Sequence, residues 1–138
     1  MGAGDAAPPP YTGVTNAHAQ IGQALAEARA AHKEVLLVFG AEWCADCHDV
    51  ERALAGPAAA SLAARFVIVR VDVGNFDRNL DIARRYGDPI RRGIPAAAVV
   101  SADDRLLYAT HGGELSHARR LGEDGIARFL LGVVPAAP

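Results

Sequence analysis

One stretch of the chain, Val-Leu-Leu-Val-Phe at residues 35–39, carries apolar side chains on both faces of any strand that it forms. Successive side chains of a strand point to opposite faces of the sheet, so both faces of such a strand need cover. The chain has 138 residues, the length of one domain, and its own helices must supply that cover. The segment therefore predicts the central strand of an α/β domain.

The rest of the chain alternates between helical and extended patterns. Residues 16–31, capped by Thr15 or Asn16, carry apolar side chains at helical spacing. Further helices are predicted from about residue 44 to the break at 56–57, and over 57–64, 77–86 and 123–133; further strands are predicted over 66–73, 96–100 and 106–110, with a hairpin turn at 101–104. Residues 88–93 and 110–121 remain as loops. This order predicts a central mixed sheet of about four to five strands with helices on both faces.

The two ends of the chain differ in composition from its middle. Residues 1–13 form an Ala/Pro-rich leader and residues 135–138 a similar tail, both expected to be flexible, so the domain is predicted to span residues 14–134. The leader lacks a basic start followed by an apolar stretch and does not have the pattern of a signal peptide. As it stands, the sequence predicts a cytoplasmic protein; a periplasmic one is the alternative if a signal peptide was removed.

Charge and hydropathy argue against two classes of partner. The formal net charge is −2 at pH 7, which gives no electrostatic reason to expect binding to nucleic acid or to an anionic membrane. No apolar run approaches the roughly 18 residues of a membrane-spanning helix, so membrane insertion is not expected. A monomer is the default oligomeric state.

Both cysteines of the chain, Cys44 and Cys47, lie in one Cys-x-x-Cys motif. A structural disulfide stabilises a protein most when it closes a long loop, and a bridge across two residues closes almost none. Stability therefore does not explain the pair. Redox chemistry and metal binding are the two interpretations left open.

The motif and its surroundings resemble the thioredoxin superfamily. Trp-Cys-Ala-Asp-Cys at 43–47 follows the buried strand and opens a helix, and four segments occur in thioredoxin order: Phe-Gly-Ala-Glu-Trp-Cys at 39–44, Val-Asp-Val at 71–73, Ala-Arg-Arg-Tyr-Gly at 83–87 and Arg-Gly-Ile-Pro-Ala at 92–96. The Trp-Cys-x-Asp-Cys variant and the long segment after Val73 resemble bacterial single-domain thiol–disulfide interchange and isomerase-like proteins. The resemblance implies a thioredoxin fold and a reductase or isomerase of protein disulfides, with a redox-active Cys44–Cys47 disulfide and no cofactor.

The position of each cysteine predicts its role. A cysteine at a helix N-terminus has a lowered pKa because the helix dipole and free N–H groups stabilise the thiolate, so Cys44 is the expected nucleophile. Cys47 follows about one helical turn later and is expected to attack the mixed disulfide and release the reduced substrate. The implied partners are proteins with a disulfide or dithiol and an upstream thiol electron donor.

Three further residues are expected to bind substrate. Pro95 aligns with the cis-proline of the thioredoxin fold, and a cis bond there would bring the backbone of Ile94 against the cysteines. An extended substrate can pair with that backbone as an added strand, so Gly93, Ile94 and Pro95 form the predicted substrate contact. Trp43 either forms an apolar lip that shields the thiolate or is a partly buried packing residue.

The sequence also departs from the thioredoxin pattern. Thioredoxins carry a buried carboxylate six residues before the first cysteine, where this chain has Val38; Asp46 and Glu42 are the nearest replacements. A carboxylate at position 46 disfavours the Cys44 thiolate, which favours a reductant or isomerase over a strong oxidant. His48 either perturbs Cys47 or is an exposed residue of the first helical turn.

Two other functions compete with this prediction. One is binding or delivery of copper or zinc through Cys44, Cys47 and His48, although a structural zinc site needs four ligands and this cluster offers three. The other is a thioredoxin-fold scaffold that binds a partner without redox turnover.

Overall fold

The computed structural model describes Tyr11 and residues 16–133. The leader expected at residues 1–13, apart from Tyr11, and the tail expected at 135–138 lie outside the described residues. The two predicted domain boundaries also lie outside them.

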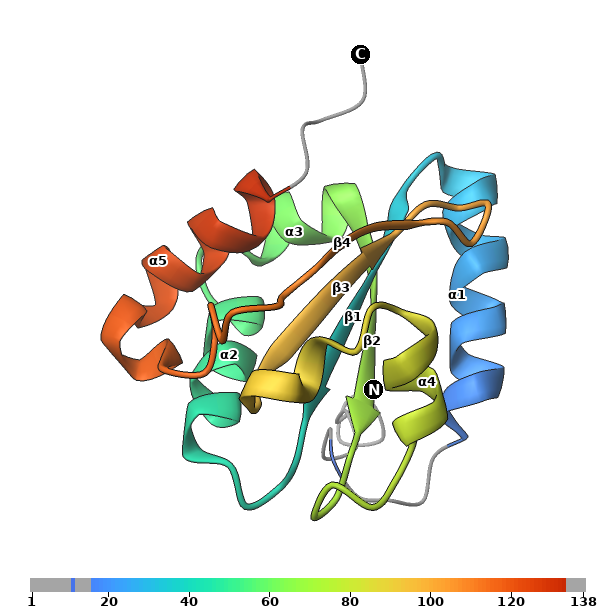
Figure 1. Cartoon of the computed structure of the whole chain (residues 1–138). Helices are drawn as coiled ribbons and strands as arrows, with labels where there is room; N and C mark the ends of the chain where they lie inside the picture. Colours follow the sequence, from blue (N-terminus) through green and yellow to red (C-terminus); the bar gives the residue numbers. More distant parts are fainter. Residues whose placement is uncertain (1–10, 12–15, 134–138) are drawn as a thin grey trace, which may run out of the picture.

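Four strands form one mixed sheet in the order β2-β1-β3-β4 (Figure 1). The strands are β1 (Glu34–Gly40), β2 (Phe66–Asp72), β3 (Ala96–Val100) and β4 (Leu106–Ala109). Strand β1 pairs in parallel with β2 and antiparallel with β3, and β3 pairs antiparallel with β4. The apolar stretch at 35–39 is thus an interior strand, and the predicted mixed sheet is confirmed.

Helices cover both faces of this sheet, as the two-sided apolar pattern of β1 requires. Helices α1 (Ala17–Ala31) and α4 (Leu80–Arg85) lie on one face; α2 (Ala45–Ala55), α3 (Ala59–Arg65) and α5 (Ala118–Gly132) lie on the other (Figure 1). Alternate residues of β1 separate into two apolar cores. Val35, Leu37 and Phe39 pack with the α1 side, while Leu36 and Val38 pack with the α2 and α5 side.

Helices α3 and α4 begin at other residues than the sequence predicts. Helix α4 begins at Leu80 rather than 77, because Asn79 adopts a left-handed φ of 54° and a helix cannot continue through it. Helix α3 begins at Ala59, after a turn, rather than at Pro57. A short 3-10 helix, η2 (Pro89–Arg92), lies within the predicted loop at 88–93.

Helix α5 differs most from its prediction, because it begins at Ala118 instead of 123. Gly122, with φ 70° and ψ 168°, divides it into a first turn and a longer second part. The first turn occupies residues that the sequence pattern leaves as loop. It lies against the start of α2, and that tertiary contact is invisible to local helix propensity.

Candidate active site

Cys44 and Cys47 lie at the N-terminus of α2, directly beyond the end of the central strand. Cys44 is the N-cap residue and Cys47 lies in the first turn; their Cα atoms are 5.2 Å apart and their sulfur atoms form a disulfide. The backbone N–H of Cys47 donates to Cys44 Sγ at 3.2 Å. An N–H at a helix N-terminus stabilises a negative charge, so in the reduced protein this geometry favours a thiolate on Cys44.

The two cysteines differ in exposure. Cys44 keeps 5% of its surface exposed, whereas Cys47 is fully buried. A thiol or disulfide arriving from outside can therefore meet the pair at Cys44. This difference agrees with the predicted roles of nucleophile and resolving cysteine.

The predicted substrate-binding residues lie beside Cys44. The carbonyl oxygen of Ile94 is 3.8 Å from Cys44 Sγ, and the peptide bond between Ile94 and Pro95 is cis. Gly93 has φ +104°, a conformation that side-chain-bearing residues rarely adopt. The side chain of Ile94 belongs to the core, so this segment presents backbone to the disulfide.

Trp43, which precedes the nucleophile, is the most exposed large apolar residue among the described residues, at 58%. Its indole Nε1 donates to the carbonyl oxygen of Gly74 at 2.8 Å. At this exposure the indole is only partly buried, so the apolar lip and the partly buried packing residue both stay predictions.

The carboxylate of Asp46 does not stand alone beside Cys44. Its Oδ1 accepts from the backbone N–H of Arg119 at 2.8 Å and from Arg119 Nε at 3.2 Å. The first turn of α5 thus borders the active site, and the positive charge of Arg119 offsets part of the field of Asp46 at Cys44. The pKa of the Cys44 thiol therefore depends on the charges of both Asp46 and Arg119.

Glu42 and His48 are linked to each other rather than to the sulfur atoms. Glu42 is exposed, and its carbonyl oxygen accepts from His48 Nε2 at 2.7 Å. This bond ties the first turn of α2 back to the segment before Cys44. Within the described residues, no group of three or more His, Cys, Asp and Glu side chains is arranged to hold a metal ion.

A partly buried polar contact between Tyr11 and Glu51 lies near Cys47 and is not predicted from the sequence. Tyr11 is 3% exposed, and its hydroxyl donates to Glu51 Oε2 at 3.4 Å; Arg70 forms an ion pair with the same carboxylate at 3.0 Å. Burial, followed by the charge of Glu51, raises the pKa of the Tyr11 hydroxyl. The spacing of Glu51, four residues after Cys47 on one helix, could have indicated it, whereas nothing in the leader marks Tyr11.

Gly40 allows Tyr11 and Cys47 to approach the same point. A Cβ atom on Gly40 would lie 2.8 Å from Tyr11 Oη and 3.1 Å from Cys47 Sγ. The phenol hydroxyl and the buried sulfur therefore both lie close to Gly40, at the end of β1. Tyr11 thus lies near Cys47 and is hydrogen-bonded in turn to Glu51.

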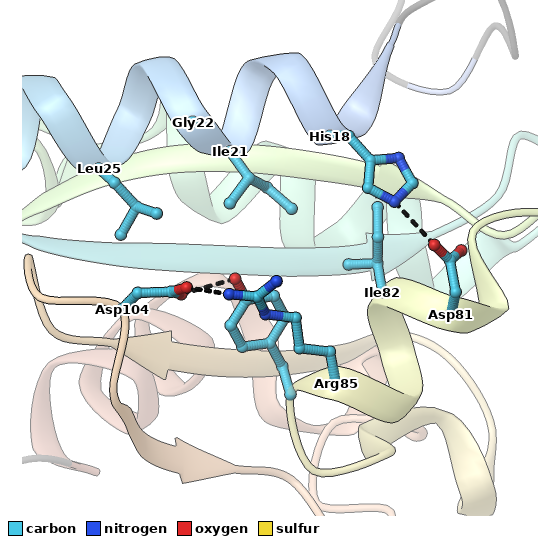
Figure 2. Close-up of a pocket in the computed structure, with 9 residues that line it drawn as sticks. His18, Ile21, Gly22, Leu25, Asp81, Ile82, Arg85 and Asp104 are labelled. Carbon is cyan, nitrogen blue, oxygen red and sulfur yellow. Dashed lines mark hydrogen bonds and ion pairs between the residues drawn. The ribbon is translucent and has the colours of Figure 1, made fainter.

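A separate cavity of about 240 Å³ lies between α1, α4 and the turn after β3 (Figure 2). Ile21, Leu25 and Ile82 line it, and polar contacts lie at its two ends. At one end His18 Nε2 lies 2.7 Å from Asp81 Oδ2; at the other, Asp104 accepts from Tyr86 and Arg85. None of the residues around the disulfide lines this cavity, so it is not part of the candidate active site.

The protein combines a mixed sheet of this order with a Cys-x-x-Cys disulfide at the N-terminus of the helix that follows the central strand. These features define the class of thioredoxin-fold thiol–disulfide oxidoreductases. A thioredoxin-like family model matches residues 16–102, and the chain belongs to that family. The resemblance inferred from the sequence is confirmed.

Two comparisons place the chain more narrowly. It is similar to a solved structure described as a disulphide isomerase from Xylella fastidiosa, with 44% identity and a TM-score of 0.86 over 93% of this chain and 98% of that one. It is also 32% identical, over 107 residues and 76% of its length, to the thiol:disulfide interchange protein DsbD 1 of Pseudomonas aeruginosa. The matched region is only 16% of that relative's length.

A thioredoxin from Thermus thermophilus shares the fold at greater distance, with 26% identity and a TM-score of 0.50 over 72% of this chain and 82% of that one. No helix of the described residues is both long and apolar enough to span a membrane.

Proposed function

We propose that the protein reduces or isomerises disulfides of other proteins through Cys44 and Cys47. The observation that carries this proposal is the reactive pair itself: a disulfide at a helix N-terminus, with the first cysteine 5% exposed beside the Ile94–Pro95 backbone and the second fully buried. The similarity to a protein described as a disulphide isomerase supports it.

The reaction proceeds by two exchanges. The Cys44 thiolate attacks one sulfur of a substrate disulfide, a mixed disulfide forms, and the other substrate sulfur leaves as a thiolate. The Cys47 thiolate then attacks Cys44 Sγ, which releases the second substrate thiol and leaves the Cys44–Cys47 disulfide. Two electrons pass to the substrate, and an upstream thiol donor returns the pair to the dithiol. If the substrate thiolate attacks another disulfide before Cys47 acts, the result is isomerisation.

We place the proton of the Cys47 thiol on a path toward Tyr11 and Glu51. Cys47 has to lose this proton before it can attack, and the carboxylate that serves this step in thioredoxins is replaced by Val38. The Tyr11 hydroxyl and Cys47 Sγ both lie close to Gly40, and the hydroxyl is hydrogen-bonded to Glu51. We favour this route over Glu42, whose side chain is exposed, and over Asp46, because Tyr11 lies close to Cys47 Sγ and leads to Glu51. Both Asp46 and Glu51 are also paired with an arginine, so that pairing does not distinguish them.

The test of the covalent mechanism is the Cys47→Ser variant. Without the resolving thiol, a mixed disulfide through Cys44 has no fast route to break down and should accumulate with a protein substrate. Non-reducing electrophoresis would detect the adduct, and the Cys44→Ser variant is the matched control that should give none. Absence of an adduct, under conditions where the wild type turns over, would contradict the assigned roles.

The direction of electron flow is tested by equilibration with reduced and oxidised glutathione. We expect a potential typical of reductants or isomerases, because Asp46 places a negative charge inside the motif that disfavours the Cys44 thiolate, and the charge of Arg119 offsets it only in part. A potential near about −120 mV would identify a strong oxidant, and one near −180 mV or below an isomerase or reductase.

The two competing functions make different predictions. Metal binding through Cys44, Cys47 and His48 requires the disulfide to be reduced and His48 to bind the ion through Nδ1, because its Nε2 is bonded to the Glu42 carbonyl. One equivalent of copper or zinc that survives dialysis, in a protein without disulfide reductase activity, would favour that function. A non-catalytic scaffold would bind its partner equally well after both cysteines are replaced by serine.

A further inference from the structure

Two large aromatic side chains are exposed next to each other at the edge of the catalytic disulfide. Trp43 is 58% and Phe76 43% exposed, their ring centroids are 6.1 Å apart, and the rings meet edge to face at 60°. Trp43 is the neighbour of Cys44 in the chain, whereas Phe76 comes from the loop after β2. Exposed apolar surface of this kind next to a reactive group indicates a binding function.

The backbone holds Phe76 in this place against its own preference. Phe76 has φ +61°, a left-handed conformation that is uncommon for a residue other than glycine and costs energy in a bulky one. The buried side chain of Asp72 supports the loop on both sides: its Oδ1 accepts from the N–H of Gly74 and its Oδ2 from Arg78. The surrounding structure therefore maintains this strained conformation, and it holds Phe76 against Trp43, the chain neighbour of Cys44.

The same loop also fixes Trp43, because the indole N–H donates to the carbonyl oxygen of Gly74. With its polar atom satisfied, the indole offers only apolar surface to an incoming chain. The positive charge of Arg78, two residues after Phe76, is paired with the carboxylate of Asp72. The pair of rings thus forms a surface that suits an apolar side chain rather than a charged one.

We propose that Trp43 and Phe76 together bind an apolar, preferably aromatic, side chain that neighbours the reacting cysteine of the substrate. This inference rests on the proposed function and extends it, since it makes Phe76 a specificity-determining residue. A substrate sulfur that reacts with Cys44 brings its adjacent residues next to Trp43, because an extended chain advances only about 3.3–3.6 Å per residue. The Ile94–Pro95 backbone borders Cys44 as well and orients the same chain.

The experiment compares two symmetric peptide disulfides that differ only in the residue beside cysteine, phenylalanine or serine. Pre-reduced enzyme reacts with each peptide, and with the small aliphatic hydroxyethyl disulfide, in single turnovers followed by chromatography. The test variant is Phe76→Asn, since asparagine tolerates left-handed φ and should preserve the loop while removing the ring. The control variant is Leu107→Ala, which removes an apolar side chain of similar exposure, 39%, from β4.

Wild type is expected to react about threefold to tenfold faster with the phenylalanine peptide than with the serine peptide. Phe76→Asn should lose most of this preference and keep its rate with hydroxyethyl disulfide, and Leu107→Ala should retain both. Equal rates of wild type with the two peptides, or an unchanged preference in Phe76→Asn, would overturn the inference while the proposed function stands. A wild-type dimer that Phe76→Asn abolishes would also overturn it, because a second copy would be the occupant. Failure of wild type to reduce any of the three disulfides would overturn the proposed function itself.

Discussion

Gly40 ends the central strand at the point where Tyr11 and Cys47 both approach it. A side chain there would meet the Tyr11 ring at 2.7 Å and Cys47 Sγ at 3.1 Å. We predict that Gly40→Ala displaces Tyr11 and lowers the free energy of unfolding by about 1–3 kcal/mol, as overpacking of a core does. Urea denaturation measures the change.

Gly22 provides the matched control for that substitution. It lies inside α1, and a Cβ atom on it would have nothing within 4 Å. Gly22→Ala should therefore raise the free energy of unfolding by about 0.5–1 kcal/mol, through helix propensity alone. Equal effects of the two substitutions would show that Tyr11 does not occupy the space over Gly40.

Asp46 and Arg119 act on the Cys44 thiol with opposite signs. We predict that Asp46→Ala lowers the pKa of the Cys44 thiol, since it removes a negative charge and leaves that of Arg119. Arg119→Ala should raise the pKa of the Cys44 thiol, because the negative charge of Asp46 is then no longer offset by that of Arg119. Thiolate absorbance at about 240 nm, followed through a pH titration, measures both. A shift of the same sign in both variants would contradict this account.

At the scale of elements, the sequence predicts those helices and strands that a local pattern determines, and it misses features that depend on contacts between distant residues. Strands β1 and β3 were predicted at nearly their observed bounds because their apolar runs are long and are bounded by polar or turn residues. The first turn of α5 was missed because its cause is a contact with Asp46, 73 positions away in the chain. The shortened α4 was missed because the helical pattern of residues 77–86 does not show that Asn79 adopts a left-handed φ.

The loop between β4 and α5 is organised around Glu114. Desolvation acts to raise the pKa of this carboxyl, but hydrogen bonds from Tyr108 and from the N–H groups of Gly112 and His111 outweigh it and lower the pKa from 4.5 to about 2. A group whose pKa is depressed by folding stabilises the protein above its unfolded pKa. Its contribution is lost as the pH falls from about 4.5 toward 2.

We therefore predict that Glu114→Gln lowers the free energy of unfolding at pH 6–7 and flattens its decline in acid. Urea denaturation at a series of pH values measures the two curves, which should converge toward pH 2. Parallel curves through this range would mean that the ionised Glu114 carboxylate does not stabilise the loop.

At the scale of the whole molecule, the sequence was sufficient for the class of fold, the reactive pair and its helix, since each has a local pattern. It was insufficient for the surroundings of the pair. Tyr11, Phe76 and Arg119 come from three segments distant in the chain, and only the folded sheet brings them next to Cys47, Trp43 and Asp46.

The cavity between α1 and α4 lies apart from that edge. His18 and Asp81 at its rim are well exposed, with 63% and 61% of their side chains accessible, so their contact is screened by water. We predict that His18→Ala changes the free energy of unfolding by less than about 1 kcal/mol and leaves the rate of disulfide reduction unaltered. A reduced rate in that variant would mean that the two regions are coupled.

The difference in exposure between the two cysteines has a kinetic consequence. Because Cys47 is fully buried, the oxidising and the reducing partner must both react at Cys44, and they must do so one after the other. Turnover should be ping-pong, with parallel double-reciprocal plots when donor and acceptor are varied together. Each partner should also inhibit competitively against the other at high concentration.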